Sequence, residues 1–501
     1  MLIWIVIIIG FLLRLSQYLS NRSLWLDEAL ISLNIINKNF TELFNNLDLQ
    51  QGAPIGFLLV EKFLVTYFGN NEFILRLFPF FCGLCSLFLF YKLTKLLLSP
   101  QAVFFSCTFF SLSEALIYYS SEVKQYSSDV LFPILIFLAS IKFVKDFSRI
   151  NRYFLLTVIF IAPWFSFPSS FLCLGVIFSL IFLNRNKPDI LKLSLLFALA
   201  WCISFGLLYS VQLRNLTTEG LKLLNSGYLP VSVFPPKVFS VKWLADICSN
   251  FISFLDFNPL LFILLFATGI YLLSRKERFF FLVFSLTTLI MFLCSYLQYY
   301  PMFHRFLLFL VPTVIIILSL GLESLSEKIK KIHLAFSLIL ILYVFSPLVI
   351  NSYDSLFNHR SFQEIKPVLR FINDHKKEND FIYVEHYAQY ALKYYAKRYR
   401  FNDNFSLRDL DSNEAQGELY TRPEYNPIYI GSLGSQNSFD NYKLELNSFS
   451  KGSRVWVLFS HSFNNKKKIL RFLDETCIRL NSYTRDNLRG GSSVFLYKFT
   501  N

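Results

Sequence analysis

Long apolar stretches alternate with short polar loops over the first two thirds of the chain. A helix needs about 20 apolar residues to cross a hydrocarbon core of roughly 30 Å. Stretches close to this length occur at residues 1–20, 73–91, 101–119, 127–143, 153–166, 168–183, 190–211, 258–273, 279–298, 303–321 and 333–350. The pattern therefore predicts an α-helical polytopic membrane protein with about eleven transmembrane helices.

The loops between these stretches differ in charge. Basic residues follow every second stretch, near residues 92–95, 142–152, 185–187, 275–278 and 328–331. By the positive-inside rule these loops are cytoplasmic, and so is the N-terminus. The outer side then carries residues 21–72, 117–128, 211–257, 299–304 and the tail from residue 352.

Residues 57–68 test this orientation. They are apolar but too short to cross, and they contain Glu61 and Lys62. Counting them as a span would reverse every later loop, so we expect an interfacial helix here. A second one is predicted over residues 31–47, whose apolar members form one helical stripe.

The composition changes near residue 352. Helix-like segments at 361–375, 387–399 and 464–476 alternate with strand-like runs at 380–385, 427–430, 454–460 and 493–499. We therefore predict two domains, a transmembrane domain over residues 1–351 and a small extracytoplasmic α/β domain over residues 352–501.

Composition narrows the possible functions. The chain is 54% hydrophobic and 16% charged, which excludes an ordinary soluble protein. Its net charge of +14 is dispersed between apolar stretches, so we expect no nucleic-acid partner. The sequence contains no P-loop, HExxH motif or paired CxxC cluster, and it predicts no cofactor and no metal site.

Two acids follow the first stretch. Asp27 and Glu28 lie in the string SLWLDEA at residues 23–29. They could be solvated carboxylates beside an interfacial Trp anchor. Alternatively, a partly desolvated carboxylate at this level could take a proton from a hydroxyl group.

The second outer loop reads YYSSEVKQYSSD at residues 118–129. It places Glu122 and Lys124 on the same side of the membrane as Asp27. The two charges could pair with each other, or they could bind a polar headgroup.

Cationic residues stand at the outer rim of two other stretches. His304 and Arg305 lie in the string YYPMFHRF at residues 299–306, and Arg76 lies near the start of the second span. Arginine binds phosphate well through its planar fork. A snorkelling arginine that fixes the depth of a span is the other interpretation.

Together these segments resemble the GT-C class of polytopic membrane glycosyltransferases, specifically the family 39-like enzymes related to protein O-mannosyltransferases and aminoarabinose transferases. The resemblance rests on SLWLDEA, on QGAPIGFLLVEKFLVTYFG followed by NEFILRLFPFFCGL at residues 51–84, on YYSSEVKQYSSD and on the rim residues His304 and Arg305. It covers the organisation of residues 1–320 and is strongest up to about residue 130.

The resemblance implies an inverting transfer of a sugar from a polyprenyl-phosphate donor to an acceptor hydroxyl at the outer face of the membrane. The short inner loops and the absence of eukaryotic retention signals favour a bacterial inner membrane over the endoplasmic reticulum, with the tail in the periplasm. The acceptor would be a glycolipid, a glycan or a protein. Asp27 would be the general base, and Arg305, Lys124, His304 and Arg76 would bind substrate. Glu28 and Glu122 would orient the acceptor or hold a cation.

One segment departs from the family pattern. Relatives that resemble aminoarabinose transferases carry an acid and a lysine before the first-loop proline, and the acid can help to bind a metal. Here Gln50 and Gln51 stand before Pro54, and a neutral amide is a weaker ligand than a carboxylate. We therefore expect transfer without a divalent cation. A flippase or transporter of lipid-linked sugars remains the alternative function, since it would need similar polar residues around a central cavity.

Overall fold

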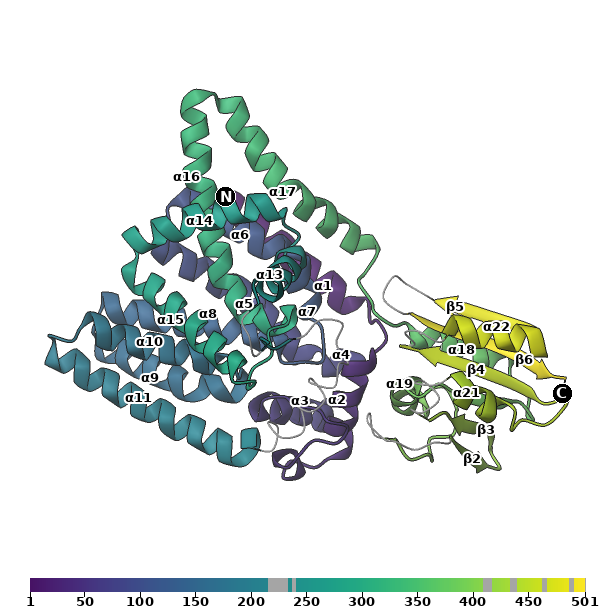
Figure 1. Ribbon diagram of the computed structural model, residues 1–501. Helices are drawn as coiled ribbons and strands as arrows, with labels where there is room; N and C mark the ends of the chain where they lie inside the picture. Colours follow the sequence, from purple (N-terminus) through teal and green to yellow (C-terminus); the bar gives the residue numbers. More distant parts are fainter. Residues whose placement is uncertain are drawn as a thin grey trace. The chain divides into compact units, whose positions relative to one another are not determined.

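The computed structural model describes residues 1–214, 233–236, 240–408, 417–432, 439–461, 466–485 and 491–500. It forms two compact units (Figure 1). The first contains Met1–Ser20, Lys38–Asn46 and Gly52–His359, and the second contains Asn21–Asn37, Leu47–Gln51 and Arg360–Asn501. The first unit ends at residue 359, and two segments of the predicted first outer loop group with the tail. The domain boundary after residue 351 stays a prediction.

The first unit is helical, and each predicted span coincides with a helix or a pair of helices. These are α1 (Leu2–Leu19), α5 (Leu77–Leu97), α6 (Pro100–Leu112) with α7 (Glu114–Tyr119), α8 (Tyr126–Lys145), α9 (Arg149–Phe165), α10 (Ser169–Leu183), α11 (Pro188–Leu208), α14 (Pro259–Lys276), α15 (Arg278–Tyr296), α16 (Val311–Ile332) and α17 (Leu334–Phe357). Within the described ranges, eight helices are long and apolar enough to cross a membrane. The chain is a multi-pass helical membrane protein, and the number of crossings stays a prediction.

The helices pack closely where side chains are small. Figure 1 shows α9, α10 and α11 side by side, and α16 and α17 as a long hairpin. α14 lies directly against α16: a Cβ atom at Gly269 would stand 1.9 Å from the Ile317 carbonyl oxygen, and one at Gly321 would stand 2.0 Å from that of Leu265. Glycine at both positions lets the two backbones approach each other.

Shorter elements complete this unit. They are η1 (Glu42–Phe44), α3 (Ile55–Phe68), α4 (Glu72–Leu75), η2 (Tyr209–Leu213), α13 (Val241–Phe254) and η3 (His304–Leu310). α3 is the helix expected over residues 57–68. Its first N–H group, that of Ile55, donates to Oε1 of Gln212 at 3.0 Å, while the Gln212 amide donates to the Ala53 carbonyl at 2.6 Å.

The prediction of one helix over residues 31–47 is wrong. α2 (Leu26–Asn37) ends ten residues earlier, and only the short turn η1 follows before residue 47. The apparent stripe does not form a single face, because Phe40 and Phe44 are exposed whereas Leu43 and Leu47 are buried. The helical spacing of these apolar residues came from two separate elements.

The second unit contains a six-stranded sheet in the order β2-β3-β1-β4-β6-β5. Its strands are β1 (Phe381–Val384), β2 (Glu418–Arg422), β3 (Tyr425–Ile430), β4 (Arg454–Ser460), β5 (Cys477–Arg485) and β6 (Ser492–Phe499). β1 pairs in parallel with β3 and β4, with Ile382 opposite both Ile428 and Trp456. The remaining pairs are antiparallel.

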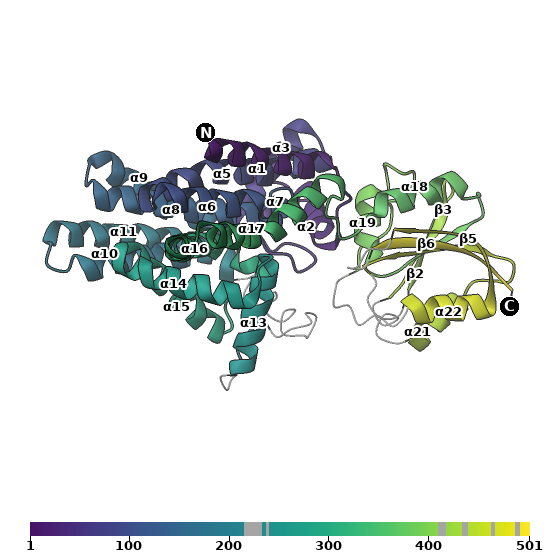
Figure 2. The same cartoon turned by 90° about the horizontal axis from the view of Figure 1, so that it is seen from above.

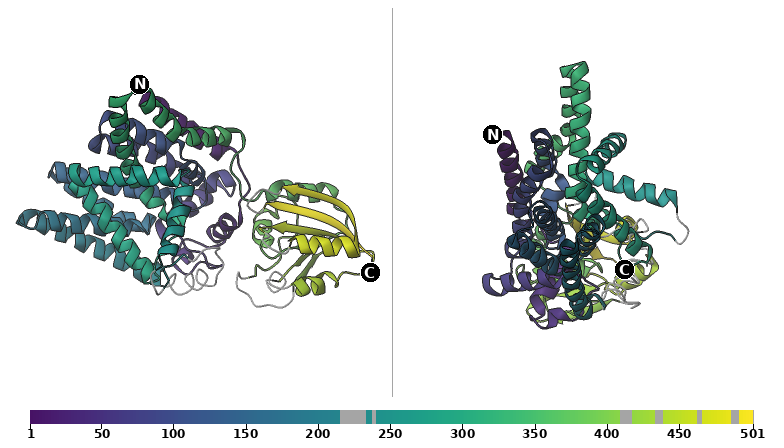
Figure 3. Two further views of the ribbon diagram at one scale, coloured as in Figure 1. Left: turned by 45° about the horizontal axis from the view of Figure 1, so that its top comes forward. Right: turned by 90° about the vertical axis from the view of Figure 1, so that its left-hand side faces the viewer.

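Helices cover both faces of this sheet. Figure 2 shows α18 (Ile365–His375) and α19 (Ala388–Tyr395) on one face, with α21 (Phe439–Leu446) and α22 (Lys466–Thr476) on the other. The left view of Figure 3 shows α22 in front of the strands. Along β4, Val455 and Val457 belong to the core under α21 and α22. Trp456 points to the opposite face, where its ring lies 6.1 Å from that of Phe371 on α18. The small α/β domain expected in the tail is confirmed.

Candidate functional site

The acidic segment, residues 21–28, follows α1 and packs in the second unit against the start of the tail. Its backbone is bound by side chains distant in sequence. The Leu24 N–H group donates to the Tyr395 hydroxyl oxygen at 2.9 Å, and the Leu26 N–H group donates to Gln363 Oε1 at 3.0 Å. These two bonds satisfy donors in a buried stretch that has no strand partner.

Ser23 adds a second set of contacts. Its N–H group donates to Oε1 of Glu364 at 3.2 Å, and its hydroxyl donates to Oε2 at 2.9 Å. The same hydroxyl oxygen accepts from the Lys366 backbone N–H at 3.1 Å. The residues before and at the start of α18 therefore hold the acidic segment at its middle.

Aromatic rings pack around Trp25. The Trp25 ring lies 4.9 Å from Phe362 and 6.5 Å from His461, which follows β4. The imidazole of His461 hydrogen-bonds the amide of Gln363. Gln363 thus connects the start of α2 to the carboxyl end of a central strand.

Asp27 and Glu28 occupy the first turn of α2, where the helix dipole favours negative charge. Their surroundings differ. Glu28 is fully buried, its Oε1 atom lies 3.6 Å from Nη2 of Arg22, and its Oε2 atom accepts from the Trp25 N–H at 3.4 Å. This reaches back to the residue before the helix, as in a capping box. Asp27 is partly exposed, whereas Glu28 is not.

The segment that departs from the family pattern lies beside α2. Asn34 joins the two, since its amide donates to the Asp48 carbonyl at 3.0 Å and its Oδ1 atom accepts from the Asp48 N–H at 2.7 Å. Leu49 and Gln50 follow with φ angles of 61° and 53°. In the part of the chain that the structure describes, no three His, Cys, Asp or Glu residues gather as metal ligands. Independence from metal stays a prediction.

The first unit contains the other candidate residues. Glu122 and Lys124 lie in the loop between α7 and α8, and both are buried. Ser120 at the start of this loop packs against α5, because a Cβ atom at Gly83 would stand 2.6 Å from its own. The second outer loop is therefore enclosed by helices.

His304 and Arg305 begin η3. The Arg305 guanidinium lies over the rings of Phe303 and Phe306, at 5.7 and 5.4 Å from their centroids. Phe306 in turn lies 6.4 Å from Tyr126, the first residue of α8. The structure thus brings η3 next to the end of the second outer loop.

Arg76 lies between α4 and α5 and is buried to 1% exposure. Several further buried acids did not figure among the predicted site residues, and two of them lie in α3 and α8. Glu61 in α3 is fully buried, and Asp129 in α8 is 4% exposed. The sequence could have indicated both, because a carboxylate within an apolar stretch is costly to bury and therefore suggests a specific role.

Structural comparison finds three informative similarities. ArnT from Cupriavidus metallidurans in the apo state is 12% identical over 99% of this chain and 97% of its own, with a TM-score of 0.51. The Archaeoglobus fulgidus oligosaccharyltransferase in complex with Zn and sulfate is 11% identical over 99% of this chain and 73% of its own, at 0.53. The same archaeal enzyme, AglB, in complex with an inhibitory peptide and a dolichol-phosphate is 9% identical over 100% and 74%, at 0.53.

Sequence comparison adds no relative: no family model matches the chain, and no curated protein matches it. The structural similarities extend over nearly the whole chain, including both units. At these identities they establish the fold and leave the reaction open. The chain has the fold of the GT-C glycosyltransferases expected from its outer-loop motifs.

Proposed function

We propose that this protein transfers a sugar from a polyprenyl-phosphate donor to an acceptor hydroxyl at the outer face of the membrane. The observation that carries the proposal is the placement of Asp27 within this fold. It is the partly exposed acid of the pair, it lies in the first turn of a helix, and it follows the first membrane helix by eight residues. A base at this place would meet a lipid carrier's headgroup while the lipid tail remains in the bilayer.

The proposed chemistry is a single displacement. The Asp27 carboxylate takes the proton of the acceptor hydroxyl, and the acceptor oxygen attacks the anomeric carbon. The bond between that carbon and the donor's phosphate oxygen breaks, its electron pair leaves with the lipid phosphate, and the configuration inverts. Phosphate leaves as a stable anion, so cationic groups suffice to stabilise the charge that develops on it.

Arg305 is our candidate for the phosphate contact, with Lys124, His304 and Arg76 as further substrate-binding residues. Arg305 begins η3 next to the second outer loop, and its planar fork suits a phosphate. Glu28, expected to orient the acceptor or hold a cation, is fully buried, and we propose instead that it positions the start of α2 through Arg22 and the Trp25 N–H group. Glu122 is proposed to orient the acceptor. The AglB complex with a dolichol-phosphate supports a lipid-phosphate ligand for this fold.

We place the protein in a bacterial inner membrane, with the N-terminus in the cytoplasm and the second unit in the periplasm. The acceptor is a glycolipid, a glycan or a protein. Modification of a single cysteine, introduced into a variant in which the eight native cysteines are replaced by serine, checks the orientation in intact cells. A cysteine at the exposed position Asn379 should react with an impermeant maleimide from outside. Reaction only after lysis would overturn the outer-face assignment.

The decisive experiment replaces Asp27 with Asn in full-length protein reconstituted in vesicles with a polyprenyl-phosphate sugar. Removing the base should lower the transfer rate by about 10²-fold or more. Asp440→Asn, at an acid whose side chain is 84% exposed, serves as the matched control and should leave the rate unchanged. If transfer survives Asp27→Asn while movement of the lipid-linked sugar across the vesicle is lost, the protein is a flippase.

A further inference from the structure

The second unit contains a pocket of about 630 Å³ that the proposed chemistry does not use. It lies between the start of α18, the residues that follow α19, and the end of β5. Its volume is in the range of small-ligand sites. Asn21, the first residue of the acidic segment, forms part of its wall.

The pocket is electropositive. Two acids, Glu364 and Asp374, line it against four cationic side chains: Lys366, Arg370, Arg398 and Arg485. Cationic groups thus outnumber acids two to one. Glu364 already accepts hydrogen bonds from the N–H and hydroxyl groups of Ser23. The remaining acid, Asp374, is exposed.

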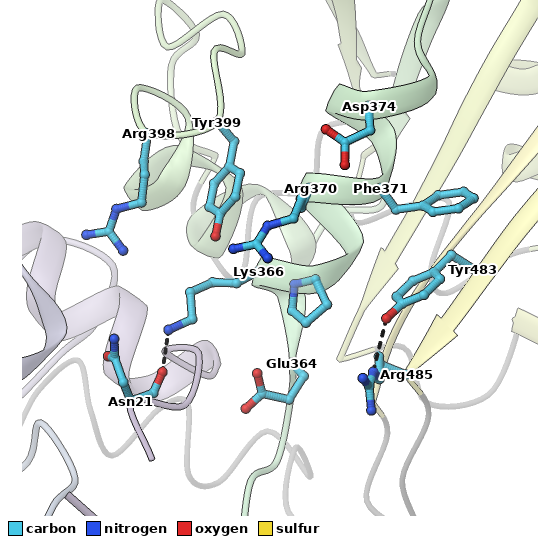
Figure 4. Close-up of a pocket in the computed structure, with 11 residues that line it drawn as sticks. Asn21, Glu364, Lys366, Arg370, Phe371, Asp374, Arg398, Tyr399, Tyr483 and Arg485 are labelled. Carbon is cyan, nitrogen blue, oxygen red and sulfur yellow. Dashed lines mark hydrogen bonds between the residues drawn. The ribbon is translucent and has the colours of Figure 1, made fainter. Parts of the chain in front are cut away.

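Figure 4 shows how the cations lie. The charged ends of Arg398, Arg370 and Lys366 point to the side of the pocket where Asn21 stands, and the Lys366 ammonium hydrogen-bonds the Asn21 carbonyl. Arg485 stands on the opposite side, where its Nε atom donates to the Tyr483 hydroxyl at 3.1 Å. Planar guanidinium groups on two sides suit phosphate or carboxylate oxygens.

Aromatic rings complete the wall. Tyr399 stands between Arg398 and Arg370 in Figure 4. On the other side, the rings of Phe371 and Tyr483 stack at 5.0 Å with 19° between their planes. A tyrosine offers an apolar ring face together with a hydroxyl that can form hydrogen bonds. That combination fits a sugar ring, which has C–H faces and hydroxyl edges.

We propose that this pocket binds an anionic saccharide, a sugar that carries a phosphate or a carboxylate. Arg370 and Arg485 hold the anionic group from opposite sides, and Tyr399 and Tyr483 contact the sugar ring. Binding as such does not depend on the transfer reaction. That the bound sugar is the acceptor rests on the proposed function; it is supported by Asn21, which lines the pocket and belongs to the segment that bears Asp27.

Calorimetric titration of the full-length protein in phosphatidylcholine nanodiscs tests the binding. The probes are glucose 6-phosphate, glucuronate, glucose and inorganic phosphate. We expect the two anionic sugars to bind at least about tenfold more tightly than glucose and than inorganic phosphate, and to bind more weakly at high salt. If inorganic phosphate binds as tightly as glucose 6-phosphate, or if no probe binds, the proposal fails.

Two variants locate the site. Arg370→Gln and Arg485→Gln should each weaken glucose 6-phosphate binding about tenfold, since each removes a charge-assisted contact. Lys397→Gln, at an exposed cation that does not line the pocket, is the control and should bind as wild type. Unchanged binding by both pocket variants would overturn the proposal. Both arginines are exposed, so thermal unfolding of the variants should match wild type and exclude misfolding.

The lipid composition of the nanodiscs distinguishes a sugar from a lipid headgroup as the ligand. Nanodiscs that contain phosphatidylglycerol should not compete for glucose 6-phosphate, and competition that Arg370→Gln abolishes would assign the pocket to an anionic lipid instead. With acceptor and donor present, Arg370→Gln should raise the KM for acceptor and leave kcat unchanged. If the anionic sugars bind but Asp27→Asn transfers at the wild-type rate, the pocket stands and the proposed function falls.

Discussion

Two polar segments, both close to the ends of apolar helices, are held in different ways. The acidic segment that contains Asp27 takes its contacts from Gln363, Glu364 and Tyr395, more than 330 residues further along the chain. The second outer loop, which contains Glu122, is enclosed by helices close to it in sequence and by η3. The first segment therefore depends on a folded tail, and the second depends on helix packing.

This difference changes the meaning of the tail. If the tail made no contact with the acidic segment, unfolding of the tail would leave that segment unchanged. Here the buried N–H groups of Leu24 and Leu26 have side-chain acceptors supplied by the tail. Loss of an acceptor leaves a buried donor unsatisfied, which costs about 1–3 kcal/mol. The tail is a structural support for the proposed catalytic residue.

Rising pH should have the largest effect, and it should act on the second unit through Glu385, the residue that follows β1. Burial raises the pKa of this carboxyl to about 8, while backbone N–H groups of Ala388, Tyr387 and Ser460 oppose the rise. In the unfolded chain the group titrates near 4.5. Between these values the unfolded state has released a proton that the folded state keeps, so stability falls as pH rises from 4.5 to 8.

Glu385→Gln removes this dependence. The variant should match wild type at pH 4.5 and exceed it at pH 8, by up to about 5 kcal/mol in the free energy of unfolding of the second unit. Hydrogen exchange of the full-length protein at several pH values measures this by peptide. Equal pH dependence in variant and wild type would contradict the assignment of the shift to Glu385.

Asp380→Ala should have the next largest effect. Asp380 is 1% exposed, its Oδ1 atom accepts from Nε of Arg454 at 2.6 Å, and its Oδ2 atom accepts from the Trp456 indole at 2.8 Å. Its loss should lower the stability of the second unit by about 3 kcal/mol. Hydrogen exchange should then speed up in residues 21–28 as well as in the sheet, and not in α16. Asp440→Ala, at the exposed acid, is the control.

Gly321→Ala tests the helix packing of the first unit. The added methyl group would meet the Leu265 carbonyl at 2.0 Å, so α14 and α16 must separate, at a cost of about 2 kcal/mol. Gly206→Ala makes the same change in α11, where nothing lies within 4 Å of the new atom, and should be neutral. Thermal unfolding in detergent compares the two. Equal melting temperatures would contradict the close approach of α14 and α16.

Tyr395→Phe should have the smallest effect. It tests a single hydrogen bond between the tail and the acidic segment. The change leaves the ring in place and removes the acceptor of the Leu24 N–H group, at about 1 kcal/mol. Transfer should fall severalfold because the segment that bears Asp27 loosens. Tyr425→Phe, the same change on β3, is the matched control. A transfer rate unchanged by Tyr395→Phe would show that this bond does not position Asp27.

The hydrophobic pattern predicted much of the architecture and failed where burial is not periodic. The apolar stretches predicted the membrane helices, and runs such as residues 454–460 predicted central strands. The edge strands β2 and β5 were not predicted, because most of their residues are exposed and show no apolar alternation. The prediction of one helix over residues 31–47 was wrong, because the regular spacing of its apolar residues combined α2 with the separate turn η1.

Sequence alone determined the membrane character, the α/β nature of the tail and the choice of SLWLDEA as a candidate site, since length, hydropathy and residue chemistry are local properties. Only the tertiary structure separated Asp27 from Glu28, which differ in burial although they are neighbours in sequence. It also joined the acidic segment to Gln363 and Tyr395. Contacts between residues so far apart depend on chain topology, and no local pattern records them.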